Sequence, residues 1–383
     1  MKIILVVGAR PNFVKISPLI KAIKKHNNTS HQSINYVLVH TGQHYDPFMS
    51  DTFFQSLEIP QPHFNLGIGS GTHAEQVGHT MIAFEKILKS EKPDWVVVVG
   101  DVNATLACSV TAKKEQVKVC HIEAGLRSGD IKMPEEINRL VTDRLSDLLL
   151  TPDQISTNNL QREGTDPSRI KMVGNIMIDS LNHALETART LDLNEIIKRN
   201  STITLDSHFE PENYALITLH RPSNVDLQKD LTKIVTFLSK NAAKEIPLVW
   251  PVHPRTLKNL TKFELLEKLK MNPNIFLLKP LSYFDMLKLN STAKVVITDS
   301  GGLQEECTVL GTPCLTMRFN TERPITLQER GGTSTLVGTD LDKLEIAFKK
   351  ALRQKRSPHI PELWDGQTAD RCLQSLIETH SQK

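Results

Sequence analysis

Three carboxylates stand at or just after short apolar segments of this chain, where they could exchange protons with a bound molecule. Asp101 ends the segment WVVVVGD, Glu123 follows VCHI, and Glu135 lies in MPEEINR. His220 ends a further segment, ALITLH. Parallel α/β sheets bind ligands outside the carboxyl ends of their strands. These four residues are therefore the candidate catalytic groups, although each acid taken alone could simply complement the positive end of a helix.

Basic residues after the first apolar segment predict contacts to an anion. The segment GARPNFVKISPLIKAI (residues 8–23) carries Arg10 and Lys15 near the start of an expected helix, with Pro18 in its first turn. Helix N-termini attract anions because their N–H groups are unpaired and the helix dipole is positive there. The alternative is a solvated loop with ordinary surface bases.

The segment ITDSGGLQEE (residues 297–306) gives a stronger signal for an anion. A strand is expected to end at Asp299, and the following Ser-Gly-Gly turns into a helix whose backbone N–H groups can approach a phosphate closely. Glu305 or Glu306, one turn on, could accept hydrogen bonds from sugar hydroxyls. The alternative is a plain strand–turn–helix corner, since the segment is neither a P-loop nor a dinucleotide-binding fingerprint.

Two further strand ends carry a histidine near an arginine. TLHRPSN contains His220 and Arg221, and WPVHPRT contains His253 and Arg255. A lone histidine is more often structural than catalytic, so the repetition of this pattern is what favours function. The sequence has neither an HExxH motif nor a Cys/His ligand spacing, so no metal is expected.

The composition is that of an ordinary globular protein and excludes some functions. Of 383 residues, 39% are apolar and 23% charged, with a net charge of +3. This charge is too small to predict nucleic-acid binding. No apolar segment approaches the roughly 18 residues that a membrane helix needs. Five cysteines without a CxxC pair favour buried thiols in a reducing cytoplasm.

Short apolar segments alternate with amphipathic ones along the chain, which predicts βαβ units and parallel sheets buried under helices. The expected strands are residues 3–7, 36–39, 96–99, 117–122, 148–150, 214–219, 247–252, 275–278, 295–297 and 313–317. A polar stretch over about residues 179–211 interrupts the pattern. We therefore expect the α/β class with two Rossmann-like, doubly wound domains, over residues 1–175 and 176–365, and a C-terminal helix over about residues 366–383 that packs back on the first domain.

Nine segments in order resemble the signatures of the non-hydrolysing UDP-N-acetylglucosamine 2-epimerases. They are GARPNFVKISPL, HTGQH, GDVNATLA, HIEAGLRSGD, MPEEINR, TLHRP, PVHPRT, TDSGGLQEE and TERPITLQERGGTSTLVG. The resemblance covers nearly the whole chain. It implies the two-domain fold of GT-B glycosyltransferases with a UDP-sugar in the cleft, no cofactor, and a homodimer.

The resemblance also implies a reaction and a role for each residue. The family interconverts UDP-GlcNAc and UDP-ManNAc by eliminating UDP to a glycal and adding it back, and the product feeds surface polysaccharides. Acid/base roles fall on Asp101, Glu123 and Glu135, with His220 near the diphosphate. The positions that match substrate-binding residues are Arg10, Lys15, His253, Ser300, Gly301, Gly302, Glu306 and Arg323. Those that match an allosteric UDP-GlcNAc site of many bacterial members are Gln43, Glu136 and Arg221.

Several alternatives stay open at the level of sequence, among them a hydrolysing relative that releases UDP and ManNAc and a catalytically silent UDP-sugar sensor. MPEEINR and GTHAEQVG also resemble relatives that act on UDP-2,3-diacetamido-glucuronate, so the sugar substituents are not fixed. A GT-B glycosyltransferase would share the fold and the donor, although it would not need three acids at strand ends.

Overall fold

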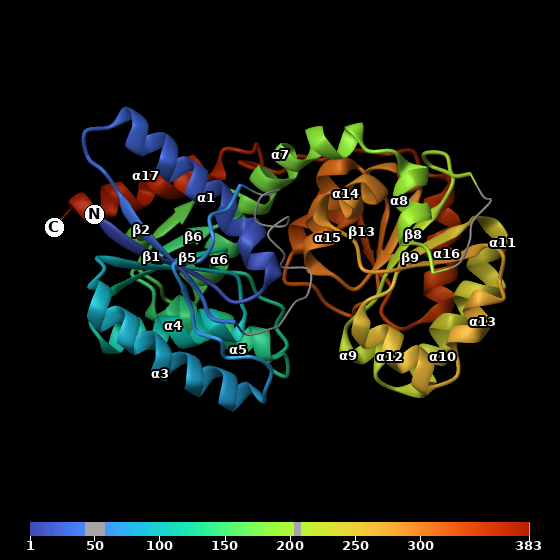
Figure 1. Cartoon of the computed structure of the whole chain (residues 1–383). Helices are drawn as coiled ribbons and strands as arrows, with labels where there is room; N and C mark the ends of the chain where they lie inside the picture. Colours follow the sequence, from blue (N-terminus) through green and yellow to red (C-terminus); the bar gives the residue numbers. More distant parts are fainter. Residues whose placement is uncertain (43–57, 203–207, 383) are drawn as a thin grey trace. The chain divides into compact units, whose positions relative to one another are not determined.

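The structure is a computed structural model that describes residues 1–42, 58–202 and 208–382. The chain forms two compact units (Figure 1). Unit 1 comprises residues 1–180 and 361–383, and unit 2 comprises residues 181–360. The first boundary falls within one helix, α7 (Ile176–Thr190).

Unit 1 is built on a seven-stranded sheet in the order β3-β2-β1-β4-β5-β6-β7, and every pairing is parallel. Val, Ile and Leu at successive positions of β1 and β4 are buried on both faces, as expected for a sheet covered on both sides. The strands are β1 Lys2–Val7, β2 Asn35–His40, β3 Phe64–Asn65, β4 Trp95–Val99, β5 Lys118–Ile122, β6 Leu148–Thr151 and β7 Ile170–Met172.

Helices cover the two faces of this sheet in separate layers (Figure 1). Phe84 and Leu88 of α3 pack with Cys108 and Ala112 of α4 on one face of the sheet. On the other face α17, the last helix of the chain, packs on α1. The helices are α1 Arg10–Thr29, α3 His73–Glu91, α4 Asn103–Lys114, α5 Pro134–Leu145, α6 Gln154–Arg162, the 3₁₀ turn η1 Pro167–Arg169, and α17 Thr368–Ser381.

Unit 2 repeats the design with a six-stranded parallel sheet in the order β10-β9-β8-β11-β12-β13. Alternate residues of one strand enter different cores: Ile217 packs in the cluster that contains Trp250, and Leu216 in the cluster that contains Phe276. The strands are β8 Ala215–Thr218, β9 Leu248–Pro251, β10 Ile275–Leu278, β11 Val295–Thr298, β12 Cys314–Thr316 and β13 Ser334–Leu336.

The helices of unit 2 follow its strands in the usual alternation. They are α8 Leu193–Asn200, α9 Pro222–Val225, α10 Gln228–Phe237, a π-helical turn η2 Leu238–Ala242, α11 Ala243–Glu245, α12 Pro254–Lys262, α13 Leu266–Lys270, α14 Tyr283–Thr292, α15 Gly301–Leu310, the 3₁₀ turns η3 Pro324–Thr326 and η4 Gln328–Arg330, and α16 Leu341–Arg353. In α8, Ile196 and Ile197 are buried in the unit 2 core, so this part of the polar stretch is an amphipathic helix of that unit.

The α/β class with two Rossmann-like sheets is confirmed, and each of the ten predicted apolar segments overlaps a strand. The expected start of the first helix was wrong. The helix α1 begins at Arg10, and Pro18 lies inside it. Pro11 takes the first turn instead, where its fixed φ and missing N–H cost nothing.

The sequence also predicts that the chain has no membrane helix and that its cysteines are buried thiols. Within the described residues, every helix is too short or too polar to span a lipid bilayer. The five cysteines are all buried thiols.

Candidate active site

The carboxyl end of the unit 1 sheet brings the loops after β1, β4 and β5 together. In this strand order the ligand crevice lies where chain direction across the sheet reverses, which is beside β1 and β4. Gly100 follows β4 with φ of +72°. A Cβ at Gly100 would lie 3.4 Å from Lys15 Nζ and 3.5 Å from Glu123 Oε2, so this turn passes directly beside both side chains.

Glu123 has the most constrained geometry of the predicted acids. It follows β5 with φ of +71°, in the left-handed region that non-glycine residues seldom adopt. Its side chain is only 3% exposed, and Oε2 lies 2.5 Å from Lys15 Nζ. The other oxygen, Oε1, is buried without a hydrogen bond in the part of the chain that the structure describes. Such strain and an unsatisfied buried oxygen are typical of functional sites.

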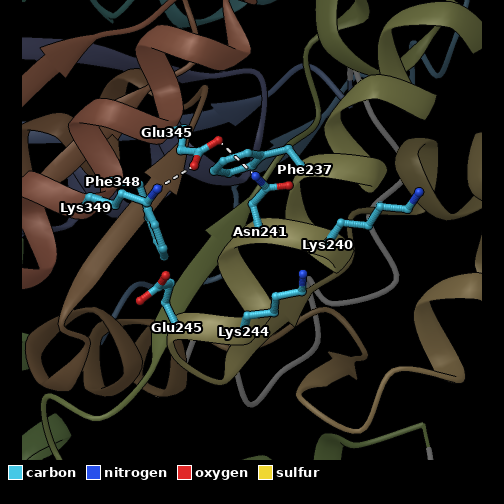
Figure 2. A pocket seen from close by; sticks show the side chains of 8 residues that line it. All are labelled: Phe237, Lys240, Asn241, Lys244, Glu245, Glu345, Phe348 and Lys349. Carbon is cyan, nitrogen blue, oxygen red and sulfur yellow. Dashed lines mark hydrogen bonds and ion pairs between the residues drawn. The ribbon is translucent and has the colours of Figure 1, made fainter.

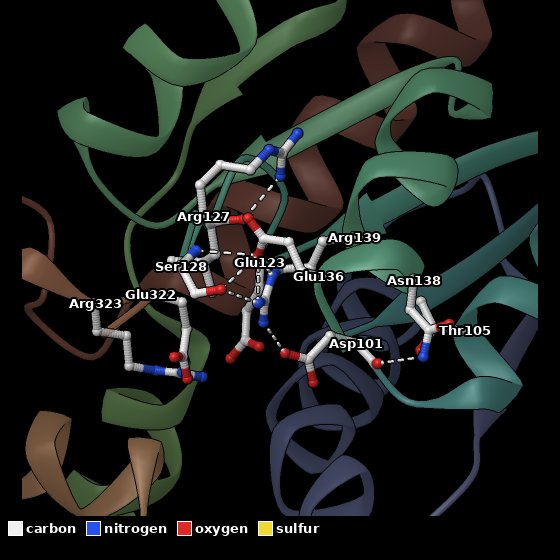
Figure 3. A network of polar contacts seen from close by, with 12 residues as sticks. Asp101, Thr105, Glu123, Arg127, Ser128, Glu136, Asn138, Arg139, Glu322 and Arg323 are labelled. Atoms are coloured by element: carbon white, nitrogen blue, oxygen red, sulfur yellow. Dashed lines mark hydrogen bonds and ion pairs between the residues drawn. The ribbon is translucent and has the colours of Figure 1, made fainter. Parts of the chain in front are cut away.

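Asp101 is held by an arginine that is itself fully buried (Figure 3). Arg139 Nη1 donates to Asp101 Oδ2 over 2.5 Å, and Nη2 donates to Glu136 Oε2, also over 2.5 Å. The Asp101 side chain keeps 25% of its surface exposed, whereas that of Arg139 keeps 1%. One face of the Asp101 carboxyl is therefore fixed and the other remains accessible.

Glu136 has contacts that account for its burial. Its carboxylate accepts hydrogen bonds from the Ser128 and Gly129 N–H groups, at 3.0 and 2.9 Å, in addition to its ion pair with Arg139. Burial disfavours the charged form, but these donors outweigh that effect and hold the pKa of Glu136 below its ordinary value. The structure thus gives Glu136 a positioning contact, and its match to an allosteric site stays a prediction.

Glu135 lies in the first turn of α5, which begins at Pro134 as predicted. It is half-buried and makes no side-chain hydrogen bond or ion pair with another residue that the structure describes. Arg10 opens α1. Gln43 lies outside the described residues.

In unit 2 a buried aspartate organises the histidine end of the sheet. Asp299 follows β11 and is fully buried. Oδ1 lies 2.8 Å from His220 Nδ1, and Oδ2 accepts from the Arg221 N–H at 2.9 Å and from Asn224 Nδ2 at 2.9 Å. Burial opposes ionisation, yet the hydrogen bonds from His220, Asn224 and Arg221 prevail and lower the pKa of Asp299.

This contact orients the His220 ring. Because the Asp299 carboxylate is an acceptor, Nδ1 donates to it, and Nε2 is the nitrogen that can meet a ligand. The side chain is 40% exposed, and its ring centroid lies 5.4 Å from that of His253. His253 caps α12 by accepting from the Arg255 N–H. Arg221, another predicted allosteric position, donates from Nε to the Asp299 carbonyl at 2.9 Å.

Ser300 is the N-cap residue of α15, which begins with Gly301 and Gly302. A Cβ at Gly301 would come within 2.6 Å of Arg323 Nη1, whereas one at Gly302 would meet nothing within 4 Å. Arg323 is buried, with Nε 2.8 Å from Glu305 and a second ion pair to Glu322. The bare backbone of Gly301 is therefore required to admit the guanidinium beside the helix start.

Glu306 lies one turn further along α15 and faces the interior. It is 4% exposed, and its Oε2 accepts from Asn290 Nδ2 at 3.3 Å. Burial raises the pKa of Glu306 to about 7, although Asn290 and Tyr283 partly counter the effect. A carboxyl group poised near neutral pH is typical of functional sites.

A hollow elsewhere in unit 2 is not this site. It holds about 140 Å³ and lies between the π-helical turn with α11 and the helix α16, with Asn241, Glu345 and Lys349 on its wall (Figure 2). Only two residues separate the end of α11 from the start of β9, so the hollow lies at the amino end of that strand. It is also smaller than the usual pocket for a small-molecule ligand. Among the described residues, no group of three or more His, Cys, Asp or Glu side chains could hold a metal ion.

Comparison with known proteins identifies the family. A sequence profile of UDP-N-acetylglucosamine 2-epimerases matches residues 26–377. The chain belongs to the UDP-N-acetylglucosamine 2-epimerase family. The UDP-N-acetylglucosamine 2-epimerase of Methanocaldococcus jannaschii is 41% identical over 379 residues, which are 98% of this chain and 99% of that protein. The resemblance stated from the motifs is confirmed.

A solved structure of this relative and a second 2-epimerase also match the chain. The crystal structure of the M. jannaschii enzyme in complex with UDP-GlcNAc and UDP matches with a TM-score of 0.89 at 39% identity, over 99% of this chain and 100% of the other. The UDP-2,3-diacetamido-2,3-dideoxy-D-glucuronate 2-epimerase of Pseudomonas aeruginosa is 40% identical over 382 residues, 99% of this chain and 100% of the relative. Both 2-epimerases therefore cover the whole chain at nearly equal identity.

Sequence reasoning singled out Asp101 and His220 as candidates but missed the residues that hold them. Arg139 and Asp299 each stand within a quoted motif, MPEEINR and TDSGGLQEE, without having been singled out as site residues. Arg139 lies three residues after Glu136 on the same helix, and this spacing predicts an ion pair. The pairing of Asp299 with His220 depends on two strands that are distant in sequence but adjacent in the sheet.

Proposed function

We propose that this chain is a UDP-N-acetylglucosamine 2-epimerase that interconverts UDP-GlcNAc and UDP-ManNAc. The observation that carries the proposal is the full-length similarity to the M. jannaschii enzyme, whose structure holds UDP-GlcNAc and UDP. The acids of the unit 1 sheet supply what the chemistry demands.

The reaction must break a C–H bond that has no neighbouring carbonyl to acidify it. We propose that a base removes the C2 proton while the C1–O bond breaks, so that the C–H electron pair forms the C1=C2 double bond and UDP leaves. UDP then adds back through its oxygen at C1 while an acid protonates C2 from the other face. A positioned acid or base contributes about 10²–10⁴-fold to such a step.

Unit 1 supplies the acid/base groups in this proposal. Glu123, strained and with one oxygen unpaired in the described chain, and Asp101, accessible on one side, are the two best-positioned carboxyls. Glu135 is the third.

Unit 2 supplies the groups that hold UDP. We assign His220, oriented by Asp299, and the α15 start at Ser300, Gly301 and Gly302 to the diphosphate, because N–H donors and a helix N-terminus stabilise developing negative charge. His253 and Arg323 would complete the nucleotide contacts. The Glu306 carboxyl would accept hydrogen bonds from ribose hydroxyls. Arg10 and Lys15 stay proposed substrate contacts of unit 1.

A second candidate substrate is UDP-2,3-diacetamido-glucuronate. It is favoured by the 40% identity to the P. aeruginosa enzyme over the full length of both chains. The same elimination would apply, because the changes lie at C3 and C6 of the sugar rather than at C1 and C2.

The test is to incubate the purified protein with each UDP-sugar in D₂O and follow the C2 proton by NMR. Deuterium at C2 of UDP-GlcNAc with formation of UDP-ManNAc is the expected result. Exchange only with the diacetamido substrate would assign the second candidate. Free ManNAc and UDP would indicate a hydrolysing enzyme. No exchange with either sugar would overturn the proposal and favour a GT-B glycosyltransferase.

We further propose a cytoplasmic homodimer whose product supplies polysaccharide synthesis. Five buried thiols suit a reducing compartment. Light scattering after gel filtration would test the dimer, for which a mass near 86 kDa is expected from two chains of 43.1 kDa.

A further inference from the structure

The inner face of α5 is polar, although it is fully buried. Glu136, Arg139 and Asp143 recur at helical spacing, and their exposed fractions are 3%, 1% and 2%. Asn138 is buried beside them. Buried polar groups are costly unless they are paired, so a helix with such a face is built to make specific contacts.

Asp143 connects two loops with one carboxylate. Oδ1 lies 2.6 Å from His121 Nδ1, and His121 Nε2 lies 2.9 Å from the Gly100 carbonyl oxygen. The His121 ring therefore bridges the Asp143 carboxylate and the Gly100 carbonyl oxygen. Oδ2 accepts from the Gly125 N–H at 3.0 Å and from Arg127 Nη1 at 2.7 Å.

The two glycines that Asp143 reaches flank the proposed catalytic acids. Gly100 immediately precedes Asp101, and Gly125 lies two residues after Glu123. Gly100, Glu123 and Gly125 all have positive φ, at +72°, +71° and +82°. Glycine adopts positive φ readily, whereas at Glu123 it is strained and persists only when the surroundings hold it in place. The contacts of Asp143 restrain both loops at once.

Other side chains of α5 reinforce the first of these loops. Asn138 Nδ2 donates to the Asp101 carbonyl at 2.8 Å, and Arg139 holds the Asp101 carboxylate. Consecutive residues of one helix therefore hydrogen-bond both the main chain and the side chain of Asp101.

We propose that Asp143 is a positioning residue, whose carboxylate fixes the loops of Asp101 and Glu123 against each other through His121 and Gly125. It touches neither acid, so it acts through the loops and not on the substrate. The proposal rests on the proposed epimerase function for its catalytic consequence, but its structural consequence can be measured separately.

The charge balance supports this role. Burial disfavours the charged form of Asp143, but His121 and Arg127 outweigh it and keep the pKa of this carboxyl below its ordinary value. Arg127 also pairs with Glu163 at 2.7 Å, which ties α6 to the same cluster. Asparagine at this position accepts through one atom only and presents its NH₂ group on the other side, so some of these buried donors lose their acceptor.

The first test is Asp143→Asn with Asp147→Asn as its control. Asp147 also joins α4 to β5, through Lys113 at 2.9 Å and the Val119 N–H at 2.7 Å, but at the amino end of the strand. We expect D143N to lower kcat about 10- to 100-fold, because small misplacements of reacting groups are costly. The Kd for UDP should change less than about 3-fold, since its proposed contacts lie in unit 2. D147N should leave kcat within about 2-fold.

The second readout does not depend on activity. Hydrogen–deuterium exchange should be faster in D143N at peptides covering residues 99–103 and 123–129 together, and unchanged there in D147N. If the wild-type protein epimerises no UDP-sugar, the proposed function fails while this measurement still decides the positioning role. Wild-type exchange in either loop of D143N, or an unchanged kcat in an active enzyme, would overturn the proposal.

His121→Asn keeps the proposal testable if D143N does not fold. It breaks the path to Gly100 but leaves the Gly125 contact, so only residues 99–103 should exchange faster. Where both variants fold, the double variant should lose little more kcat than D143N alone, because the two side chains act in series. Full additivity, or loosening of both loops by H121N, would contradict the proposal.

Discussion

At the scale of single residues, Glu306 couples the folding of unit 2 to pH. Its carboxyl is buried against Asn290, and burial raises its pKa to about 7 from an ordinary value of 4.5. The folded state therefore binds a proton more tightly than the unfolded state between these two values. Stability falls as pH rises through this window, since ionisation must then occur in a buried site.

We predict that Glu306→Gln removes this pH dependence. The variant should match the wild type near pH 4.5 and become more stable above pH 7, by up to about 3 kcal/mol. Urea unfolding of the ligand-free protein at pH 5 and pH 8 measures the difference. Glu267→Gln, at an exposed carboxylate of the same unit, is the control and should show no such trend. Parallel pH curves for E306Q and the wild type would contradict the buried, proton-binding carboxyl.

The residues that hold the acids mark the limit of prediction from sequence at this scale. Asp101 and Glu123 were found because each ends an apolar segment, a signal that is local in the chain. Asp143 carries no such signal: it lies in the last turn of α5, and its partners His121 and Gly125 are 22 and 18 residues away. Pairings of this range become visible only when the sheet order is known.

At the scale of elements, the start of α15 depends on the absence of one side chain. Arg323, held by Glu305 and Glu322, occupies the space that a Cβ of Gly301 would need. Gly302 has no such neighbour, although both glycines belong to the same motif. Gly301 is therefore needed for packing against Arg323, whereas the space beside Gly302 is open and could admit a ligand.

We predict that Gly301→Ala destabilises unit 2 by about 1–3 kcal/mol, because the guanidinium must move out of its buried ion pairs. Gly302→Ala should be neutral or slightly stabilising in the free protein, since alanine favours a helix. Thermal unfolding measures both. UDP affinity should fall in G302A as well if a phosphate approaches that backbone. Equal stability of G301A and the wild type would contradict the tight contact with Arg323.

The elements that were predicted and those that were missed differ in length and burial. β4 consists of one Trp and four Val residues, all of them buried, and β-branched and aromatic residues of this kind predict a strand. β3, β7 and β13 were not predicted, since they have two or three residues and include exposed or half-buried positions. Edge strands of this kind have no apolar segment of their own and form because a neighbouring strand offers hydrogen bonds.

At the scale of the whole molecule, Asp179 fastens the last helix to unit 1. Its carboxylate accepts from the Thr368 and Ala369 N–H groups at 3.1 and 2.7 Å, at the start of α17. Gln367, the N-cap residue of α17, makes no side-chain cap of its own. Asp179 therefore serves as the cap from a position nearly 190 residues earlier in the chain.

We predict that Asp179→Asn lowers the stability of unit 1 by about 1–2 kcal/mol, because an amide can accept from one N–H but presents its NH₂ group to the other. Urea unfolding and hydrogen exchange of α17 measure the effect. Asp370→Asn, at an exposed residue in the first turn of α17, is the control and should cost less than about 0.5 kcal/mol. Unchanged exchange in α17 of D179N would show that this cap does not hold the helix.

The placement of α17 has a consequence for synthesis on the ribosome. Unit 2 is a continuous stretch of chain, whereas unit 1 needs residues 361–383, which are translated after the whole of unit 2. Until then the surface of α1 that α17 covers stays exposed, and one face of the sheet lacks part of its helical cover. The nascent N-terminal half must therefore wait about 10–40 seconds, at ordinary translation rates, for its last helix. During that interval this uncovered surface of unit 1 is accessible to chaperones.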